Sequence, residues 1–510
     1  MEENISRTRN ASLNTLWAII SQGIIVIISL FSRKIFLDYL GAELLGVNSL
    51  FTDILLLFSF ADLGLGTAIM FSMYNPIAEN KKDKIQSLLV FYREVYNYVI
   101  GGLFVISLLF IPFLFSVNST ISFGDLLVYY LFFQANNIIQ YVWAYRESYV
   151  IASQNERILT KVNLYFSIIT TIILIIIVIL FSNYLLYLVL TLLLCVVKKL
   201  WINEYIKRKY PITIIDNVEN ITKEEKKGII KKSVALLITK IGNLLINQTD
   251  SLVVSVMINV TQWGFASNYI VIKRSIFTID DKIYSGILPS MGNLVAGHDK
   301  ERELFVFLKY DFLNAWMHTF FFVAFATLST PFVALFFGKD VTLSNSFVFI
   351  FFLAAFIDGL RSPISVLREA SGTYEVDKWY TMVAAGVNLL VSLPLAYYMG
   401  LDGVFLGTIC AMLVLHISRT IILFKKGDYN MTSLQYLYLI LKHIVIGVIF
   451  FYITSYIVRE ICSYIDYDYI SFVISGLLVI IIPNILWLAI YYKNENFQQI
   501  INRIKLKYNE

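Results

Sequence analysis

The chain has 510 residues, of which 58% are hydrophobic and 15% are charged, and its mean hydropathy is +0.70. These values exclude an ordinary soluble protein, while the formal net charge of +5 is modest. Long apolar runs such as SIITTIILIIIVILF (167–181) predict membrane-spanning helices and not barrel strands. We therefore expect an all-α polytopic membrane protein.

Windows of about 20 apolar residues predict about 14 transmembrane helices. These predicted spans lie near residues 13–36, 48–71, 93–115, 125–144, 162–181, 185–202, 233–257, 265–290, 311–336, 346–366, 381–398, 404–423, 436–458 and 468–491. With the N-terminus in the cytoplasm, the inner segments hold 29 lysines and arginines, and the outer loops hold only Lys339 and Arg459. The positive-inside rule therefore predicts that both termini are cytoplasmic.

The first span ends on its outer side with two basic residues, Arg33 and Lys34, against the positive-inside tendency. Either these residues pair with Asp38 or Glu43, or they mark the outer mouth of a substrate cleft. Both interpretations remain open at this point.

The second span contains two carboxylates, Asp53 and Asp62. A buried carboxylate can be tuned to take up a proton, so both are candidates for ion coupling, with H⁺ or Na⁺ as the possible ion. They are also candidates for pairing with basic residues inside the membrane. The fourth span continues into a stretch rich in aromatic and amide side chains, FFQANNIIQYVWAYRESY (132–149).

The longest polar segment runs from Lys198 to Lys232 and holds ten of the inner basic residues. We expect a cytoplasmic linker that either lies against anionic lipid headgroups or is simply solvated. Because this is the only basic cluster in the sequence, nucleic acid is not an expected partner. The seventh span, which follows the linker, carries Lys240 and Asp250.

The eighth span carries five ionisable side chains, which are Lys273, Arg274, Asp280, Asp281 and Lys282. Trp263 is expected as an anchor at the outer interface, which puts Lys273 and Arg274 near the bilayer midplane. Positions seven apart share a helix face, so Lys273 lies over Asp280 and Arg274 lies over Asp281. A central charge costs about 2.5–3.5 kcal/mol on insertion scales, so these cations either face a water-filled cleft for an anionic substrate or join a structural ion-pair network.

The remaining spans contain fewer charged residues. His318 in the ninth span and His416 in the twelfth are interpreted as core histidines with satisfied hydrogen bonds. Asp358 and Arg361 in the tenth span are three residues apart, so they either form a local helical pair or contribute to a substrate and ion path.

An internal repeat with an offset of 218 residues connects the two parts of the chain. It relates Gly46 to Gly264 and Asp62 to Asp280. Six spans per copy is an even number, so both copies enter the membrane in the same direction, as in transporters with parallel repeats. The expected organisation is an N-terminal six-helix half (1–202), a basic cytoplasmic linker (203–232), a C-terminal six-helix half (233–425), and two appended helices with a cytoplasmic tail (426–510).

The stretch SRKIFLDYLGAELLGVNSLFTDILLLFSFADLGLGTAI (32–69), the loop YNPIAENKKDK (74–84) and the twice-six-plus-two layout resemble a known family. They are similar to the Wzx-type polysaccharide flippases of the multidrug/oligosaccharidyl-lipid/polysaccharide (MOP) exporter superfamily. The resemblance implies a V-shaped bundle that alternates between inward-open and outward-open states in the bacterial cytoplasmic membrane. It covers residues 1 to about 425, and the last two helices fit the 14-span members.

The resemblance implies that the substrate is an undecaprenyl-diphosphate-linked oligosaccharide for capsule, O-antigen or exopolysaccharide assembly. It also implies membrane lipids, a glycan polymerase and assembly proteins as partners. No cofactor is expected. The basic candidates for the substrate cleft are Lys273, Arg274, Arg33, Lys34, Lys240 and Arg361. The candidates for ion coupling or charge pairing are Asp53, Asp62, Asp250, Asp280, Asp281 and Asp358. This mixture of signs departs from the strongly cationic cleft of lipid II flippases and weakens a peptidoglycan-precursor assignment.

Two other classes of protein compete with a flippase. An ion-coupled exporter of drugs or other small molecules would belong to the same superfamily, but midplane cations do not suit cationic drugs. A polytopic glycosyltransferase or glycan polymerase would need a sizeable outer loop, and every predicted outer loop is short. The sequence contains no P-loop and no H-E-x-x-H motif, and its three cysteines have no metal-ligand spacing, so we expect neither an ATP-driven pump nor a metal site.

Overall fold

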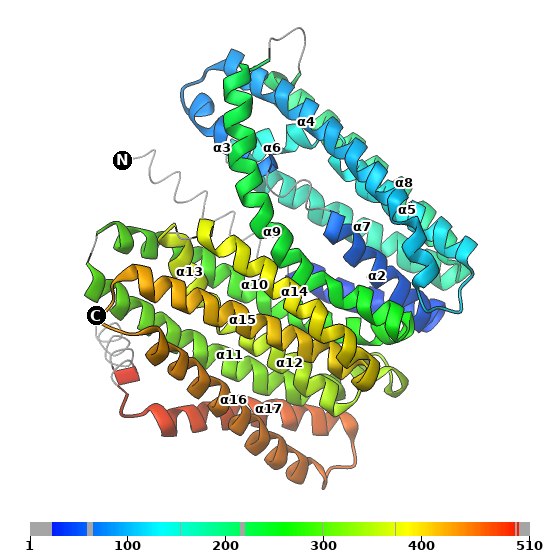
Figure 1. The fold of residues 1–510 in the computed structure, drawn as a ribbon. Helices are drawn as coiled ribbons and strands as arrows, with labels where there is room; N and C mark the ends of the chain where they lie inside the picture. Colours follow the sequence, from blue (N-terminus) through cyan, green and yellow to red (C-terminus); the bar gives the residue numbers. More distant parts are fainter. Residues whose placement is uncertain are drawn as a thin grey trace, which may run out of the picture. The chain divides into compact units, whose positions relative to one another are not determined.

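A computed structural model describes residues 23–494, 497 and 498, apart from 59–64, 154, 215–219, 298 and 373. These residues form helices joined by short connections, and no strand occurs among them (Figure 1). The chain divides into two compact units, residues 1–264 (unit 1) and residues 265–510 (unit 2). The expected all-α fold is therefore confirmed.

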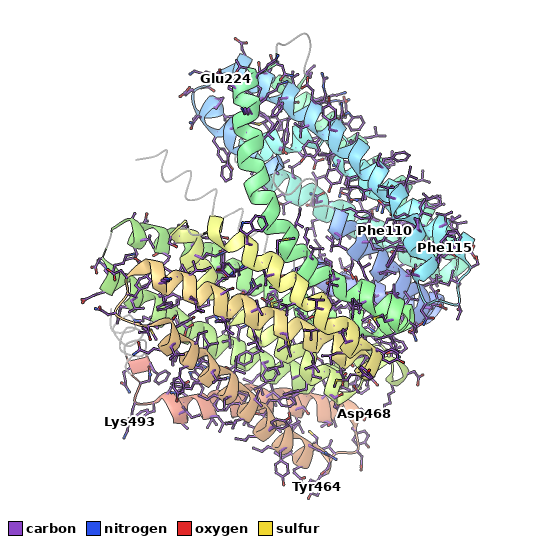
Figure 2. The ribbon with its side chains drawn as sticks, in the orientation of Figure 1. Phe110, Phe115, Glu224, Tyr464, Asp468 and Lys493 are labelled. Carbon is purple, nitrogen blue, oxygen red and sulfur yellow. The ribbon has the colours of Figure 1, made fainter. Side chains whose placement is uncertain are left out.

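The described part of unit 1 contains a helix over residues 23–40, eight further α-helices and two short 3₁₀ turns. The α-helices are α2 (Ala42–Phe58), α3 (Leu65–Ala78), α4 (Lys82–Leu109), α5 (Phe123–Tyr141), α6 (Ala144–Ala152), α7 (Glu156–Phe181), α8 (Tyr184–Lys209) and α9 (Lys223–Met257). The 3₁₀ turns are Ile111–Ser116 and Pro211–Thr213. Figure 2 shows Glu224 at one end of unit 1, and Phe110 and Phe115 at the other.

The described part of unit 2 contains most of α10, seven further α-helices and the 3₁₀ turn Lys339–Val341. The α-helices are α10 (Val260–Ala296), α11 (Lys300–Phe336), α12 (Asn345–Gly359), α13 (Ser362–Ala370), α14 (Tyr374–Met399), α15 (Leu401–Gly427), α16 (Ser433–Cys462) and α17 (Asp468–Tyr491). α17 runs from Asp468 towards Lys493, which lie at opposite ends of the helix in Figure 2.

Short polar residues begin several of these helices because they satisfy the free backbone N–H groups of the first turn. The Ser122 side chain accepts a hydrogen bond from the N–H of Asp125 at the start of α5. At the start of α9, Thr222 and Glu225 form a reciprocal capping box. Polar residues therefore separate the long apolar segments and set where each helix begins.

Nine helices in the described part of the chain are long and apolar enough to cross a membrane. Their outward faces are apolar: on α7, for example, Ile172, Ile176 and Leu180 are 51%, 48% and 67% exposed. These residues are four apart and lie on one helix face, which suits contact with lipid and would be unfavourable in water. The chain is a multi-pass membrane protein.

The helices cover the predicted spans, but several extend beyond them: α4 begins at Lys82 and α11 at Lys300, each 11 residues before the predicted start. α8 continues to Lys209, beyond the predicted end at 202, and α9 begins at Lys223, so the predicted linker of residues 203–232 is partly helical. The extension is stabilised by packing, because Ile202 and Ile206 are buried in a cluster with Val150 and Leu159.

The internal repeat is visible in where the helices begin. The helix pairs α2 and α10, α4 and α11, α6 and α13, and α7 and α14 each begin 218 residues apart. The two short helices α6 and α13 have the same length of nine residues, and each follows the preceding helix after a break of two residues. The predicted repeat is therefore reproduced element by element.

The starts of α2 and α10 cross at two glycines that are equivalent in the repeat. A Cβ added to Gly46 would lie 2.0 Å from the carbonyl oxygen of Val260, and one added to Gly264 would lie 2.5 Å from that of Ala42. Asn118 holds the same region from the other side, because its N–H donates to Ser255 O at 2.9 Å. Only glycine permits so close an approach of two helix backbones.

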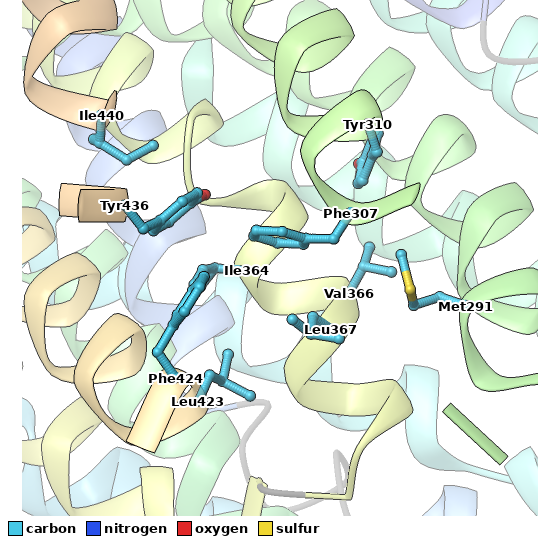
Figure 3. Packing of buried hydrophobic residues seen from close by; sticks show 10 residues of the cluster. All are labelled: Met291, Phe307, Tyr310, Ile364, Val366, Leu367, Leu423, Phe424, Tyr436 and Ile440. Carbon is cyan, nitrogen blue, oxygen red and sulfur yellow. The ribbon is translucent and has the colours of Figure 1, made fainter. Parts of the chain in front are cut away.

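The core of unit 2 lies where α10, α11, α13, α15 and α16 meet (Figure 3). Phe307 of α11 is fully buried there, with its ring centroid 5.2 Å from that of Tyr436 on α16. Phe424 of α15 stacks on the Tyr436 ring at 5.1 Å, and its centroid lies 6.1 Å from that of Phe307, so the three rings form one cluster. The appended helix α16 is thus packed into unit 2 by aromatic side chains.

Candidate functional site

Lys273 lies deep within the long helix α10. It follows the helix start at Val260 by 13 residues, which is about 20 Å along the helix axis. Its side chain is half-buried, with the ammonium nitrogen 5.5 Å from the ring centroid of Phe277 and 5.6 Å from that of Phe351 on α12. Among the described residues no carboxylate forms an ion pair with Lys273. Two aromatic faces therefore stabilise a half-buried cation whose charge also acts on the carboxylate of Asp358, without a direct ion pair to it among the described residues.

The other ionisable residues of α10 are divided between its exposed and buried faces. Arg274, Asp281 and Lys282 are exposed, whereas Asp280 is only 8% exposed. Asp280 lies with its Oδ1 3.3 Å from Nε2 of His318 on α11. The partner of Asp280 in the described structure is thus a histidine of the next helix. Lys273, seven residues earlier on the same face of α10, is not the ion-pair partner of Asp280.

His318 fits against α12 only because residue 359 is a glycine. A Cβ at Gly359 would lie 2.0 Å from Nδ1 of His318. The carbonyl oxygen of Gly359 also accepts a hydrogen bond from Nδ2 of Asn314 at 3.0 Å. The prediction that His318 is a core histidine with a hydrogen-bond partner is confirmed. His416, by contrast, is buried, and neither of its ring nitrogens has a partner among the described residues, so that prediction is wrong for His416.

Asp358 and Arg361 form a local ion pair across the break between α12 and α13. Both side chains are largely buried, and the N–H of Arg361 donates to Asp358 O at 3.1 Å. The interpretation as a local helical pair is confirmed. Because the charge of Arg361 is compensated within its own span, it offers less to an anion than Lys273 does.

In unit 1, Asp53 and Trp263 form a buried hydrogen bond. Nε1 of Trp263 donates to Oδ2 of Asp53 at 3.2 Å, and Trp263 is 3% exposed. The expectation that Trp263 anchors the chain at the outer interface is therefore wrong, because a buried carboxylate and not the headgroup region takes its N–H. Asp250 is likewise buried, at 5% exposure.

Lys34 forms an ion pair with Asp38, one helical turn later, at 2.8 Å. Of the two interpretations of Lys34, pairing with a nearby carboxylate is therefore the one that the structure supports. Arg33 instead lines a cavity of about 390 Å³ within unit 1, between the helix 23–40 and helices α2, α5, α7 and α8. Two predicted site residues, Asp62 and the side chain of Lys240, lie outside the described part of the chain.

The cavity also contains residues that the sequence reasoning assigned elsewhere. Lys198 was expected at the start of the cytoplasmic linker, but it is part of α8 and lines the cavity. Asn136 and Gln140, from the amide-rich stretch of the fourth span, line it as well. The signal for Lys198 in the sequence was weak, because a lysine near a predicted span end is ordinarily an interface residue.

Among the described residues, no group of three or more His, Cys, Asp or Glu side chains could hold a metal ion. The described residues instead provide three charged features. These are the half-buried Lys273 in unit 2, the cavity in unit 1 that Arg33 and Lys198 line, and the buried pair of Asp280 and His318. Lysine and arginine at such positions can hold an anionic group, and a buried Asp–His pair can hold a proton.

No protein-family model matches this sequence, and no curated protein matches it. Solved structures do match. The lipid II flippase MurJ in an inward closed conformation matches over 94% of this chain and 99% of that chain, with a TM-score of 0.70 and 15% sequence identity.

An inward-facing multidrug resistance MATE family transporter of the MOP superfamily matches over 79% of this chain and 94% of that chain, with a TM-score of 0.60 and 17% identity. A MOP superfamily transporter from Pyrococcus furiosus, described by the reverse polarity of its binding pocket, matches over 82% and 94%, with a TM-score of 0.55 and 16% identity. The chain therefore has the fold of the MOP superfamily, as the resemblance implied.

Proposed function

We propose that this protein is a flippase that moves an undecaprenyl-diphosphate-linked oligosaccharide across the bacterial cytoplasmic membrane by alternating access. The glycan serves the assembly of capsule, O-antigen or exopolysaccharide, and glycan polymerase and assembly proteins are the proposed partners. The protein acts as a transporter and not as an enzyme. H⁺ and Na⁺ are both candidates for the coupling ion.

Lys273 is the observation that carries this proposal. A lysine inside a membrane-spanning helix costs about 2.5–3.5 kcal/mol on insertion scales. Lys273 has two aromatic neighbours and no direct carboxylate ion pair among the described residues, and Asp358, the carboxylate on which its charge acts, is already paired with Arg361. An anionic moiety of a transported substrate, such as a diphosphate, supplies the missing counter-charge.

The fold supports a lipid-linked substrate over a free one. The lipid II flippase matches 94% of this chain, whereas the MATE transporter leaves about a fifth of it unmatched. A flippase-like chain therefore accounts for more of this protein than a transporter of the MATE type does. The polyprenyl tail stays in lipid while the charged and sugar groups cross.

One observation favours the alternative, an ion-coupled exporter of small molecules. The buried pair of Asp280 and His318 is suited to taking up a proton during a transport cycle. Ion coupling is compatible with a flippase as well, so the pair does not by itself distinguish the two substrates.

The test is to replace Lys273 and Arg274 together with glutamine and to measure surface polysaccharide and protein abundance. We expect at least a tenfold loss of surface polysaccharide with unchanged abundance, because the anionic group loses its counter-charge. Lys282→Gln is the matched control, since Lys282 is an exposed lysine of the same helix. Normal surface polysaccharide from the double variant would contradict the role of these cations.

A deletion strain tests the function itself. Removal of the protein should cause a lipid-linked oligosaccharide to accumulate on the cytoplasmic leaflet, detected by its inaccessibility to externally added glycan-modifying enzymes. If no such intermediate accumulates and surface polysaccharide is unchanged, the protein is not this flippase.

A further inference from the structure

A second buried Asp–His pair lies in unit 2, between α11 and the appended helix α16. Nε2 of His443 lies 3.5 Å from Oδ2 of Asp311, and both side chains are buried. Neither of these two atoms makes a hydrogen bond among the described residues. The pair has no part in the role proposed for Lys273, so its own chemistry has to be explained.

The burial of this pair requires that it hold a proton. A carboxylate inside a protein is costly unless it is protonated or meets a cation. Oδ1 of Asp311 accepts a hydrogen bond from the Tyr436 hydroxyl at 2.7 Å, which brings no charge. No lysine or arginine in the described part of the chain forms an ion pair with Asp311. The compensating proton is therefore either on the carboxyl group or on His443.

The surroundings of His443 accommodate both protonation states of its ring. The hydroxyl of Tyr491 on α17 lies 3.5 Å from Nδ1 of His443. A hydroxyl group can donate to the nitrogen of a neutral imidazole or accept from the N–H of an imidazolium. Tyr491 is also the last residue of α17, so its hydroxyl leads from the pair towards the helix end. The ring can thus gain or lose a proton and keep a partner at Nδ1.

The other titratable groups at the pair are tyrosines. Tyr310 of α11, Tyr436 of α16 and Tyr491 of α17 each lie within electrostatic range of the Asp311 carboxyl. The ammonium of Lys442 on α16 lies 5.5 Å from the Tyr491 ring centroid and forms no ion pair with Asp311. Phenol groups ordinarily titrate near pH 10, so at neutral pH the proton belongs to the Asp–His pair. The charged residues of α12, α13 and the break between them pair with one another, Asp358 with Arg361 and Arg368 with Glu369.

Helix α11 also contributes to the other Asp–His pair. Asp311 and His318 are seven residues apart on α11, so they share a helix face and lie about 10 Å apart along the axis. Tyr310, whose hydroxyl makes a 3.0 Å hydrogen bond with Ser362, lies within electrostatic range of both Asp280 and Asp311. Chains of Asp and His inside a membrane are typical of proton relays in pumps and transporters. Unit 2 therefore holds two such pairs at two depths along one helix.

We propose that Asp311 and His443 form a proton-binding site of the transport cycle, coupled along α11 to the pair of Asp280 and His318. The inference rests on the proposed function and deepens it, because it names H⁺ as the coupling ion. A ring nitrogen opposite Oδ2 suits a proton, whereas hard metal cations take oxygen ligands.

Proton release gives the site its effect on conformation. The bond from the proton to Nε2 or to the carboxyl oxygen breaks, the proton passes to water, and a neutral imidazole and an ionised carboxylate remain. A buried carboxylate without a counter-charge is strongly destabilising. Release therefore favours a state in which α16 separates from α11 and water reaches Asp311.

The four histidines of the chain make a direct measurement practical. NMR of full-length protein in detergent, with ¹⁵N-labelled histidine, reports on only these imidazoles, and His443→Gln identifies the signal of His443. We expect the His443 signal of the wild type to titrate with one midpoint between about pH 5 and pH 8. A His443 signal that stays constant over this range would overturn the inference.

Tyr436→Phe tests whether Asp311 sets this titration. The variant removes the hydroxyl that donates to the carboxylate, so the proton should bind more tightly and the His443 midpoint should rise by about one pH unit. Tyr438→Phe is the matched control, because Tyr438 lies on the same helix and is 71% exposed. Equal midpoints for the two variants would show that Asp311 does not share the proton of His443.

Two further titrations test the coupling and the ion. In His443→Gln the titration of His318 should differ from that in the wild type, because coupled sites titrate together. An unchanged His318 titration would overturn the coupling along α11. Sodium chloride and potassium chloride at equal concentrations should give the same His443 midpoint. A lower midpoint in sodium alone would show that Na⁺ competes for the carboxylate and would overturn the choice of H⁺.

Export shows whether the site serves transport. Asp311→Asn should lower surface polysaccharide at least tenfold at unchanged protein abundance, and Tyr438→Phe should not; normal export by Asp311→Asn would overturn H⁺ coupling here. A constant His443 signal, together with loss of export in the Lys273→Gln/Arg274→Gln variant, would remove the proton site and leave the flippase intact. A titrating His443, with surface polysaccharide unchanged by gene deletion, would instead remove the flippase and leave the proton site.

Discussion

The crossing of α2 and α10 makes a quantitative prediction for Gly46→Ala. The new Cβ would lie 2.0 Å from the carbonyl oxygen of Val260, 2.8 Å from its carbonyl carbon and 3.2 Å from the N–H nitrogen of Gly264. Ordinary van der Waals contact begins near 3.4 Å, so the two backbones must separate by about 1.4 Å. No side-chain rotamer can relieve a contact between a Cβ and a backbone.

Overpacking of this kind costs about 1–3 kcal/mol, and we take the upper end because both partners are backbone. Alanine recovers about 1 kcal/mol relative to glycine inside a helix. For a chain of this length, the net loss of about 2 kcal/mol corresponds to a drop of about 2–4 °C in the thermal unfolding midpoint, measured on purified protein in detergent.

Gly286→Ala is the control, because Gly286 lies in α10, the helix that Gly46 of α2 approaches, and a Cβ there would meet nothing within 4 Å. We expect its unfolding midpoint to equal or slightly exceed that of the wild type. If both variants unfold at the wild-type temperature, the close crossing of α2 and α10 does not exist in the folded protein and the prediction is refuted.

Two further predictions concern single contacts. Gly359→Ala puts a Cβ 2.0 Å from Nδ1 of His318, so it should push the imidazole ring away from Asp280. We expect a loss of stability of about 1–3 kcal/mol, seen as a lower unfolding midpoint. Gly386→Ala is the control, because a Cβ there meets nothing within 4 Å, and equal midpoints for the two variants would refute the prediction. At the outer start of α2, burial raises the pKa of Glu43, but hydrogen bonds from Thr120 and its neighbours outweigh this and hold the pKa below 4.5. Because the pKa of Glu43 is lower in the folded state, its carboxylate stabilises the fold above pH 4.5, and this stability is lost as the pH falls through the folded-state pKa. The unfolding midpoint of the wild type should therefore fall more between pH 6 and pH 4 than that of Glu43→Gln. Parallel dependences of the two midpoints on pH would contradict this.

Much of the architecture could be predicted because the membrane imposes it on the sequence. Helices must be long and apolar to cross a bilayer, so windows of hydrophobicity located α5, α15 and α17 to within a few residues. The repeat offset of 218, read from glycines and aspartates, reappears as the separation between the starts of α4 and α11.

The candidate site was only partly predictable. The local pair of Asp358 and Arg361 could be read from spacing, because residues three apart on a helix are neighbours whatever surrounds them. The contact of Asp280 with His318 could not, since it joins residues 38 positions apart on different helices. The predicted domain boundaries and the substrate roles of the cations stay predictions.

The sequence by itself determined the class of protein and the repeat, because hydrophobic length and equal spacing act locally or along the chain. The direction of the helices, read from basic loops, stays a prediction. Only the tertiary structure decided which charges are neutralised. Lys198 and Lys199 are adjacent in sequence and chemically identical, yet one meets Glu147 and the other lines a cavity. Helix rotation and packing, which no single segment encodes, separate a lysine that is held in an ion pair from one that lines a cavity.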